Sequence, residues 1–93
     1  MKFEWDRAKA LKNEKKHKVS FEDARTVFLD PNARLMDDPD NSEIEEPFVI
    51  LGISEKLQML VVCHCYRKTG QIIRIISARK AQRHEQKQYT RFL

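Results

Sequence analysis

The sequence predicts a two-layer α+β fold with an antiparallel sheet of three to four strands, two N-terminal helices and a C-terminal helix. Two helix-capping signals lie in the first third of the chain, apolar strand-like runs occupy the middle, and a polar tail follows. Successive strands joined by short turns must pair antiparallel. A length of 93 residues suits one domain, residues 1–93.

The first expected elements are a short strand and a helix. Phe3–Trp5 fits the strand. Asp6 can cap the helix that follows, because its carboxylate can accept a hydrogen bond from a free N–H of the first turn. This helix is expected from about Arg7 to about Lys16. Basic residues at helical spacing form a stripe along it: Lys9, Lys12 and Lys16.

A second helix is expected from Phe21 to about Phe28. Ser20 is its candidate N-cap, and Asp23 makes this start close to a capping box. Its apolar residues recur at helical spacing and form a candidate core stripe: Phe21, Ala24, Val27 and Phe28. The turn-forming residues 30–32 end this helix.

The strands of the sheet are expected between residues 33 and 76. Ala33–Met36 fits a short strand, and the acidic stretch Asp37–Glu46 is predicted to be an exposed loop. Three apolar runs predict longer strands: Phe48–Ile53, Met59–Tyr66 and Gln71–Ile76. The tail from Ala78 onward is predicted to be a helix capped by Ser77.

Charge is distributed in three blocks. Residues 1–20 contain seven Lys/Arg and three Asp/Glu, residues 21–58 contain three and ten, and residues 59–93 contain eight and one. The block charges of +4, −7 and +7 sum to the formal net charge of +4. Basic segments of this density suit a polyanion such as nucleic acid. A solvated helix face would carry the same charges, so both interpretations stay open.

Targeting and redox features favour a cytoplasmic protein without membrane contact. The N-terminus carries charges where a signal peptide needs an apolar stretch, and no apolar run of about 18 residues is present. Cys63 and Cys65 are one residue apart and cannot form an ordinary disulfide. In a strand they face one way and His64 the other. We therefore expect core cysteines, no metal and no cofactor.

Several motifs, in this order and spacing, resemble the BrnT toxin family. Those of the N-terminal part are Phe3-Glu4-Trp5-Asp6, Lys9-Ala10, Asn13, Lys16-His17 and Val19-Ser20-Phe21-Glu22-Asp23-Ala24. The most distinctive one is Arg74-Ile75-Ile76-Ser77-Ala78-Arg79-Lys80-Ala81, and Glu85 and Tyr89 also match residues often found in the family. The match extends over nearly the whole chain. In one departure, Pro47 follows Glu45-Glu46 where the family commonly has an arginine.

The resemblance implies a RelE-like fold and the toxin role in a type II toxin–antitoxin system. It implies a metal-independent endoribonuclease that inhibits translation and growth and is neutralised by a BrnA-like antitoxin. Such antitoxins are small DNA-binding proteins, so operator DNA would be bound only through the toxin–antitoxin complex. The alternative is a non-catalytic nucleic-acid-binding module, or a co-repressor that acts with an antitoxin.

Cleavage of RNA by its own 2′-hydroxyl needs proton transfers and stabilisation of charge on the phosphate. Arg74 and Arg79 are the candidates for the phosphate, because guanidinium forks onto two oxygens and stays charged. Arg74 interrupts an apolar run, where an ion pair with Glu45 or Glu46 is the alternative. Arg79 is expected in the first turn of the tail helix, where an anion is favoured.

His64 and His17 are the candidates for proton transfer. A three-residue loop ending at Gly70 would pair His64 with Arg74 on one face of the sheet. Arg74 would then lower the pKa of His64 by like-charge repulsion. A two-residue loop would set His64 on the other face. For His64 a satisfied core position, and for His17 a cation at the end of the first helix, are equally compatible with the sequence.

Four further basic residues are predicted to bind RNA: Lys9, Arg67, Lys80 and Arg83. Arg83 lies one turn beyond Arg79 and would extend a basic helix face. Trp5 could stack on a base, although a lone Trp is more often part of a core or an interface.

Overall fold

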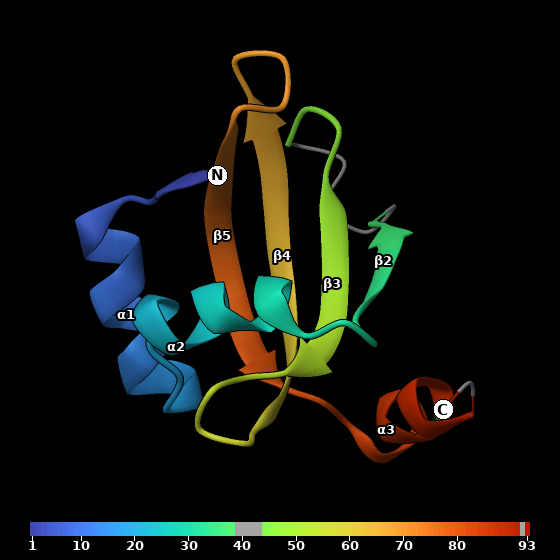
Figure 1. Ribbon diagram of the computed structural model, residues 1–93. Coiled ribbons are helices and arrows are strands. Elements are labelled where there is room, and N and C mark those ends of the chain that lie inside the picture. The colour runs from blue at the N-terminus through green and yellow to red at the C-terminus, as the bar shows by residue number, and fades with distance from the viewer. Residues whose placement is uncertain (39–43, 92) are drawn as a thin grey trace.

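The computed structural model describes residues 1–38, 44–91 and 93, so residues 39–43 of the predicted acidic loop lie outside the described residues. The described elements run in the order β1 (Lys2–Glu4), α1 (Arg7–His17), α2 (Phe21–Arg25), the 3-10 helix η1 (Thr26–Leu29), β2 (Arg34–Asp37), β3 (Phe48–Ile53), β4 (Met59–Arg67), β5 (Ile72–Lys80) and α3 (Arg83–Thr90). They form an α+β fold around one sheet (Figure 1).

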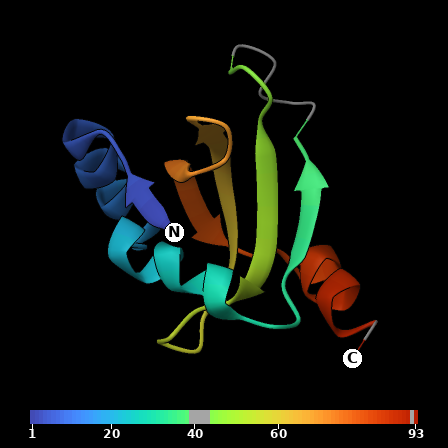
Figure 2. The same ribbon diagram turned by 45° about the horizontal axis from the view of Figure 1, so that its top comes forward.

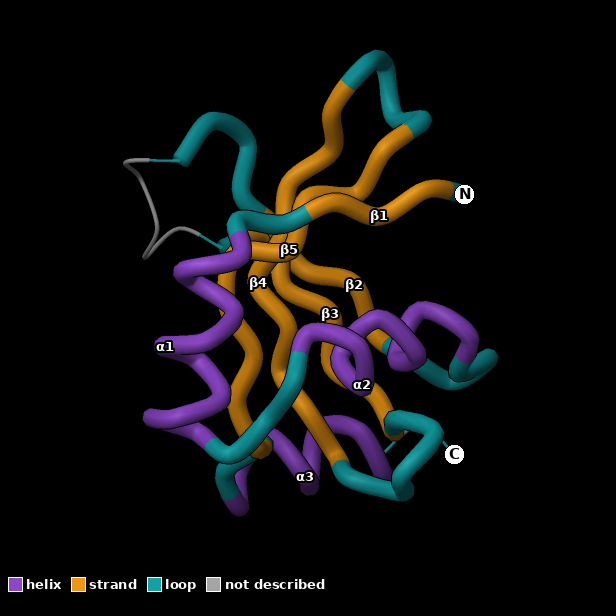
Figure 3. The backbone as a smooth tube through the Cα atoms, turned by 90° about the vertical axis from the view of Figure 1, so that its left-hand side faces the viewer, coloured by secondary structure: helices purple, strands orange, loops and turns teal. Residues whose placement is uncertain are grey.

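The sheet has five strands in the order β1-β5-β4-β3-β2. From β2 to β5 the strands pair antiparallel, as predicted. The prediction of a purely antiparallel sheet of three to four strands was wrong in one respect, because β1 joins as an edge strand parallel to β5. Figure 3 views the molecule from the side of α1 and shows β1 beside β5. The sheet is therefore mixed.

Two faces of the sheet differ in what covers them. We call the face under α1, α2 and η1 the covered face, and the opposite one the open face (Figure 2). The covered face carries the larger core, which includes Phe21, Leu60 and Ile75. A smaller cluster lies on the open face at one end, where Tyr89 of α3 packs against Leu51 and Val61. Toward the other end, the open face carries Arg67 and Arg74 beside the less polar Cys65 and Ile76.

The predicted helix caps are confirmed. The Asp6 carboxylate accepts a hydrogen bond from the Lys9 N–H at 3.0 Å, and the Ser20 hydroxyl accepts one from the Asp23 N–H at 3.0 Å. The core stripe is confirmed as well: Phe21, Ala24 and Val27 are fully buried, and Phe28 packs against them. Helical hydrogen bonding tightens after Arg25 into η1, so the predicted second helix is two short elements.

The C-terminal helix does not begin at Ala78 as predicted. Strand β5 continues to Lys80, because Leu60 and Val61 of β4 offer backbone partners to Lys80 and Arg79. Helix α3 begins at Arg83 behind a capping box in which Gln82 is the N-cap and Glu85 the reciprocal partner. Arg79 and Lys80 therefore lie in a strand, so the prediction that Arg79 lies in the first turn of a helix, where an anion is favoured, was wrong.

The hairpin between β4 and β5 is longer than predicted. Arg67 pairs with Ile72 around a turn in which Thr69 and Gly70 both have positive φ, as in a type I′ turn. The connecting loop is one residue longer than predicted, so His64 pairs with Ile75. Farther from the turn, a register shift between Cys63 and His64 adds one residue to β5, and Cys63 pairs with Ser77. Arg74 lies opposite Cys65. The predicted pairing of His64 with Arg74 was therefore wrong.

Candidate functional site

A cavity of about 460 Å³ lies on the open face where β4 and β5 meet the hairpin turn and the segment before β3. Its lining mixes charged and apolar side chains: Ile44, Glu45, Glu46, Cys65, Tyr66, Arg67, Lys68, Arg74 and Ile76. Three of these residues are cations and two are carboxylates. The chain thus gathers residues from three separate segments at one end of the sheet.

Arg74 lies on β5 with its side chain 30% exposed. Its Nη1 donates to Oε2 of Glu4 at 2.7 Å, and Nε of Arg67 lies 3.5 Å from the same oxygen. The parallel pairing of β1 and β5 sets Glu4 directly beside Arg74. An ion pair for Arg74 was one of the two interpretations of the sequence, but its partner is Glu4 and not Glu45 or Glu46, which line the cavity instead.

His64 lies on the covered face and is fully buried. Its Nδ1 is 3.0 Å from the Val62 carbonyl oxygen, so Nδ1 carries the proton, and Nε2 is left to accept from the Tyr66 hydroxyl at 3.3 Å. The ring also packs edge-on against Phe28, with centroids 4.8 Å apart. Burial lowers the pKa of His64, and the Val62 hydrogen bond opposes the shift. The prediction that repulsion by Arg74 would lower the pKa of His64 was wrong in its cause.

Arg79 lies on the open face and makes a two-bond ion pair with Glu85 of α3. Its two terminal nitrogens donate to the two carboxylate oxygens at 2.8 Å each. The hydrogen bond from Arg79 holds the pKa of Glu85 below its usual range, and the same bond raises the pKa of Arg79. Arg79 does not line the cavity at Arg74. The two predicted phosphate ligands therefore belong to different parts of the open face.

The other predicted residues are divided among three places. Arg67 lines the cavity beside Arg74. Lys9 is exposed on α1, and Lys80 and Arg83 are exposed around the start of α3. His17 is partly exposed at the last turn of α1, where a cation is favoured, so it lies on neither strand of the cavity. Of the predicted site residues, the fold brings Arg67 and Arg74 together.

Other expectations concern the cysteines and Trp5. Neither cysteine forms a disulfide, and both are buried on the open-face side of β4. Burial, reinforced by Asp38, raises the pKa of the Cys63 thiol to about 12, so it stays protonated. Trp5 packs edge-on against Phe21 with centroids 5.9 Å apart, which is the core position that a lone Trp more often takes.

Two residues have clear roles in the structure that were not predicted from the sequence. Glu4 was noted only as part of a motif, and its ion pairs depend on a strand pairing that spans 70 residues. Asn13 is buried and binds the backbone of β5: its side-chain amide donates to the Ala78 carbonyl at 2.9 Å and accepts from the Ala78 N–H at 3.0 Å. A polar residue inside a helix next to apolar strands was the only signal available for Asn13.

The arrangement at the cavity can bind an anion and move protons. Arg67, Lys68 and Arg74 supply positive charge, and Glu45 and Glu46 are carboxylates within the same cavity. Within the described ranges, no cluster of three His, Cys, Asp or Glu side chains suits a metal ion. No described helix is long and apolar enough to cross a membrane. The fold and the cavity define a small α+β protein with one open, cation-bearing sheet face.

Comparison with known proteins gives the family. Residues 5–85 match the family model described as the ribonuclease toxin BrnT of type II toxin–antitoxin systems. The crystal structure of the Brucella abortus ribonuclease toxin BrnT superposes with a TM-score of 0.69 at 21% identity, over 89% of this chain and 99% of that one. No curated protein sequence matches. The chain belongs to the BrnT family of ribonuclease toxins.

Proposed function

We propose that this protein is a metal-independent endoribonuclease that inhibits translation and growth until an antitoxin neutralises it. The observation that carries the proposal is the cavity on the open face, where Arg67 and Arg74 lie side by side among titratable groups. The family supports ribonuclease activity in general. The arginines supply the charge that the transferring phosphate requires, without a metal.

In this mechanism Arg74 holds the scissile phosphate. Its guanidinium is partly exposed, and it stabilises the extra negative charge that forms when the 2′-hydroxyl attacks. Proton transfer falls to groups that share the cavity, namely Glu45, Glu46 and Lys68. We do not assign it to His64, because a fully buried ring on the covered face cannot reach RNA. His17 remains a candidate only if RNA extends to the end of α1.

Arg79, Lys9, Lys80 and Arg83 are proposed to hold RNA outside the cavity. Long-range attraction to phosphates does not require them to converge on one point. Arg79 is expected to contribute less than Arg74, because Glu85 already occupies both of its terminal nitrogens. Pro47, in place of the family arginine, removes one cation from the segment beside the cavity, so activity that depends on that arginine must here come from Arg67 or Lys68.

The test is cleavage of RNA by the purified chain in EDTA. We expect cleavage to persist, and to fall strongly in Arg74→Ala. Loss of cleavage in EDTA with recovery on adding magnesium would contradict metal independence. In bacteria, the chain alone should stop growth, and co-expression of the neighbouring gene product should restore it. The expected partner is a BrnA-like antitoxin with an acidic or amphipathic segment, and operator DNA should bind only the complex.

The competing function is a non-catalytic nucleic-acid-binding module or co-repressor. One observation favours it: both Arg74 and Arg79 are ion-paired, and the histidine in the central strand is buried. Binding of RNA without any cleavage, together with normal growth when the chain is expressed alone, would establish this alternative over the ribonuclease.

A further inference from the structure

One carboxylate oxygen connects two arginines at the cavity. Oε2 of Glu4 accepts from Nη1 of Arg74 at 2.7 Å and lies 3.5 Å from Nε of Arg67. The two guanidinium groups come from neighbouring strands, β5 and β4. Two like charges that share one region repel each other, and an opposite charge between them offsets this repulsion. Glu4 supplies that charge.

Both arginines keep part of their hydrogen-bonding capacity. In the contacts of the described residues, each uses one nitrogen for Glu4, and a guanidinium has three nitrogens with five N–H donors. The pair of Arg79 and Glu85 differs, because both terminal nitrogens of Arg79 are bound to both carboxylate oxygens. The contacts with Glu4 therefore leave N–H donors of both guanidinium groups available to a ligand.

Glu4 contacts both arginines but is not among the residues that line the cavity. Arg67 and Arg74 belong to the described lining of the cavity, and Glu4 does not. A ligand in the cavity would meet the two guanidinium groups first. This placement suits a residue that orients the arginines, and it does not suit a base that takes a proton from the ligand.

We propose that Glu4 is a positioning residue that joins Arg67 and Arg74 into one clamp for an RNA phosphodiester. Two guanidinium groups held at a fixed distance can bind the phosphate from two sides, and bidentate contacts of this kind add geometric specificity to charge. The effect on cleavage rests on the proposed ribonuclease function, whereas the clamp itself is a binding site that exists with or without catalysis.

The first test replaces Glu4 by Gln, which keeps the length of the side chain and removes its charge. We expect kcat to fall by about tenfold or more because the arginines lose their common anchor. KM should stay equal or fall, because the cavity gains one unit of positive charge. A general loss of structure would not separate the two constants in this way. The control is Glu14→Gln on the exposed side of α1, which should change neither constant.

A double-mutant test asks whether Glu4 acts through the arginines. In a variant that already carries Arg67→Ala and Arg74→Ala, the further change Glu4→Gln should leave the residual rate unaltered. A loss of the same size as in the wild-type background would overturn the proposal. Glu4→Asp, which keeps the charge but shortens the reach, should lower kcat as Gln does, and full activity in Glu4→Asp would equally contradict a clamp of fixed span.

A binding measurement separates the clamp from the ribonuclease function. An uncleavable 2′-O-methyl oligonucleotide is added while the Nε–Hε NMR signals of Arg67 and Arg74 are followed. We expect both signals to shift with one midpoint in wild type and with different midpoints in Glu4→Gln. Shared shifts without RNA cleavage would leave the clamp standing and refute the ribonuclease. Cleavage without any shift at the two arginines would refute the clamp alone.

Discussion

Polar side chains on the covered face and on the open face of the same sheet differ in burial and in how many of their hydrogen-bonding groups are satisfied. On the covered face, His64 is fully buried and both ring nitrogens have partners inside the protein. On the open face, the Arg74 side chain is 30% exposed and its ion pair uses one nitrogen. A satisfied, buried group stabilises the fold, and a partly satisfied, accessible one can exchange its partner for a ligand.

The difference explains why the titratable residues of adjacent strands cannot be judged by residue type alone. Histidine is the side chain best suited to proton transfer near neutral pH, yet here burial lowers the pKa of His64 and aromatic rings enclose it. The arginines, which bind phosphate well, lie on the accessible side. Four substitutions, two on each face, sharpen or break this contrast.

The largest expected effect comes from Asn13 at the margin of the covered face. Strand β1 pairs with residues 72–74 of β5 only, and farther along the strand the Asn13 amide takes the place of a neighbouring strand at Ala78. It also donates to the Val19 carbonyl at 3.0 Å. Asn13→Ala leaves these backbone groups buried without partners, and we expect a loss of about 3–5 kcal/mol in the free energy of unfolding.

Urea unfolding measures this loss, with Gln88→Ala as the control because Gln88 is an exposed residue of α3. The control should change stability by less than about 0.5 kcal/mol. A comparably small effect of Asn13→Ala would show that α1 is held to β5 by apolar contacts alone.

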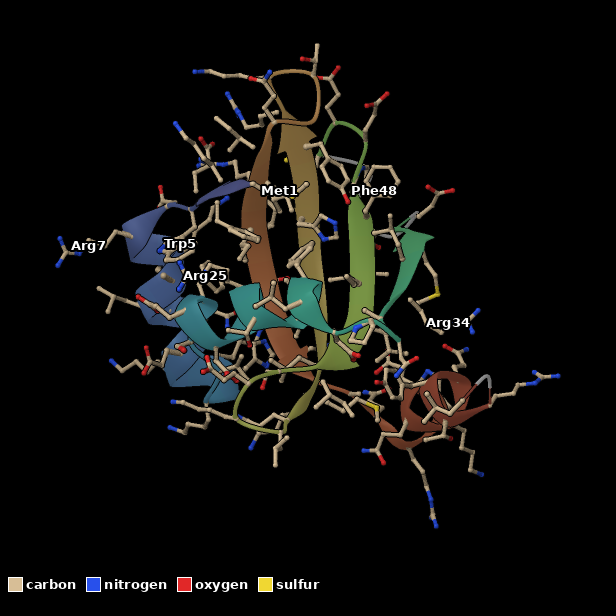
Figure 4. All side chains as sticks on the ribbon, viewed as in Figure 1. Met1, Trp5, Arg7, Arg25, Arg34 and Phe48 are labelled. Atoms are coloured by element: carbon tan, nitrogen blue, oxygen red, sulfur yellow. The ribbon has the colours of Figure 1, made fainter. Side chains whose placement is uncertain are left out.

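The second effect concerns Arg74 on the open face. Arg74→Ala should lower RNA cleavage by about a hundredfold or more, as removal of one donor to a transition-state anion does elsewhere. The thermal midpoint should change little, because the side chain is partly exposed. Arg25→Ala is the control, since Arg25 is an exposed cation on the α2 side of the molecule (Figure 4). Equal losses in both variants would mean that general charge, and not the cavity, carries the activity.

The sequence predicted the local elements well. Asp6 and Ser20 were identified as caps because capping depends on a few consecutive residues, and the core stripe of the second helix follows from spacing alone. The α+β class and the antiparallel order of β2 to β5 follow from short connections. These features need no knowledge of distant partners.

The features that could not be predicted from the sequence depend on contacts between residues that are far apart in the chain. The end of β5 was missed because Ser77 to Lys80 looks polar and helix-compatible, and strand pairing with Leu60 and Val61 overrides that preference. One extra residue in the β4–β5 loop sets Arg74 opposite Cys65 and moves it away from His64. Glu4 reaches Arg74 only through the parallel pairing of the first and the last strand along the chain. The strand register therefore decides which side chains lie together in the site, and residue types alone do not determine that register.

The third prediction concerns the pH dependence of stability through His64. Its pKa is lowered in the folded protein from a value of 6.5. Below pH 6.5 the unfolded chain therefore binds the proton more readily, so stability should fall as the pH decreases through this range, by at most about 1.4 kcal/mol per pH unit. Replacing His64 by Gln should remove this slope between pH 7.5 and pH 5.5.

Urea unfolding across this range gives the slope, and His84→Gln, an exposed histidine of α3, is the control that should keep it. If His64→Gln and wild type lost stability in parallel with falling pH, the imidazole would be accessible to protons from solvent in the folded state. The covered face would then resemble the open face more than its burial indicates.

The smallest expected effect comes from Glu85, which ties Arg79 to α3 on the open face. The pair has two bonds of 2.8 Å, but the Arg79 side chain is 39% exposed, so water screens its attraction. We expect Glu85→Gln to lower stability at pH 7 by less than about 1 kcal/mol. The pKa of Glu85 is lowered from 4.5, so the pair stabilises the fold above that pH and is lost as pH falls through the lowered value. Wild type and variant should thus converge in stability when urea unfolding is measured at acidic pH.

The same variant also frees the terminal nitrogens of Arg79 from their carboxylate partner. RNA cleavage should nevertheless change far less than in Arg74→Ala. A loss of cleavage as large as that of Arg74→Ala would place Arg79 in the catalytic site and extend the site along the whole open face.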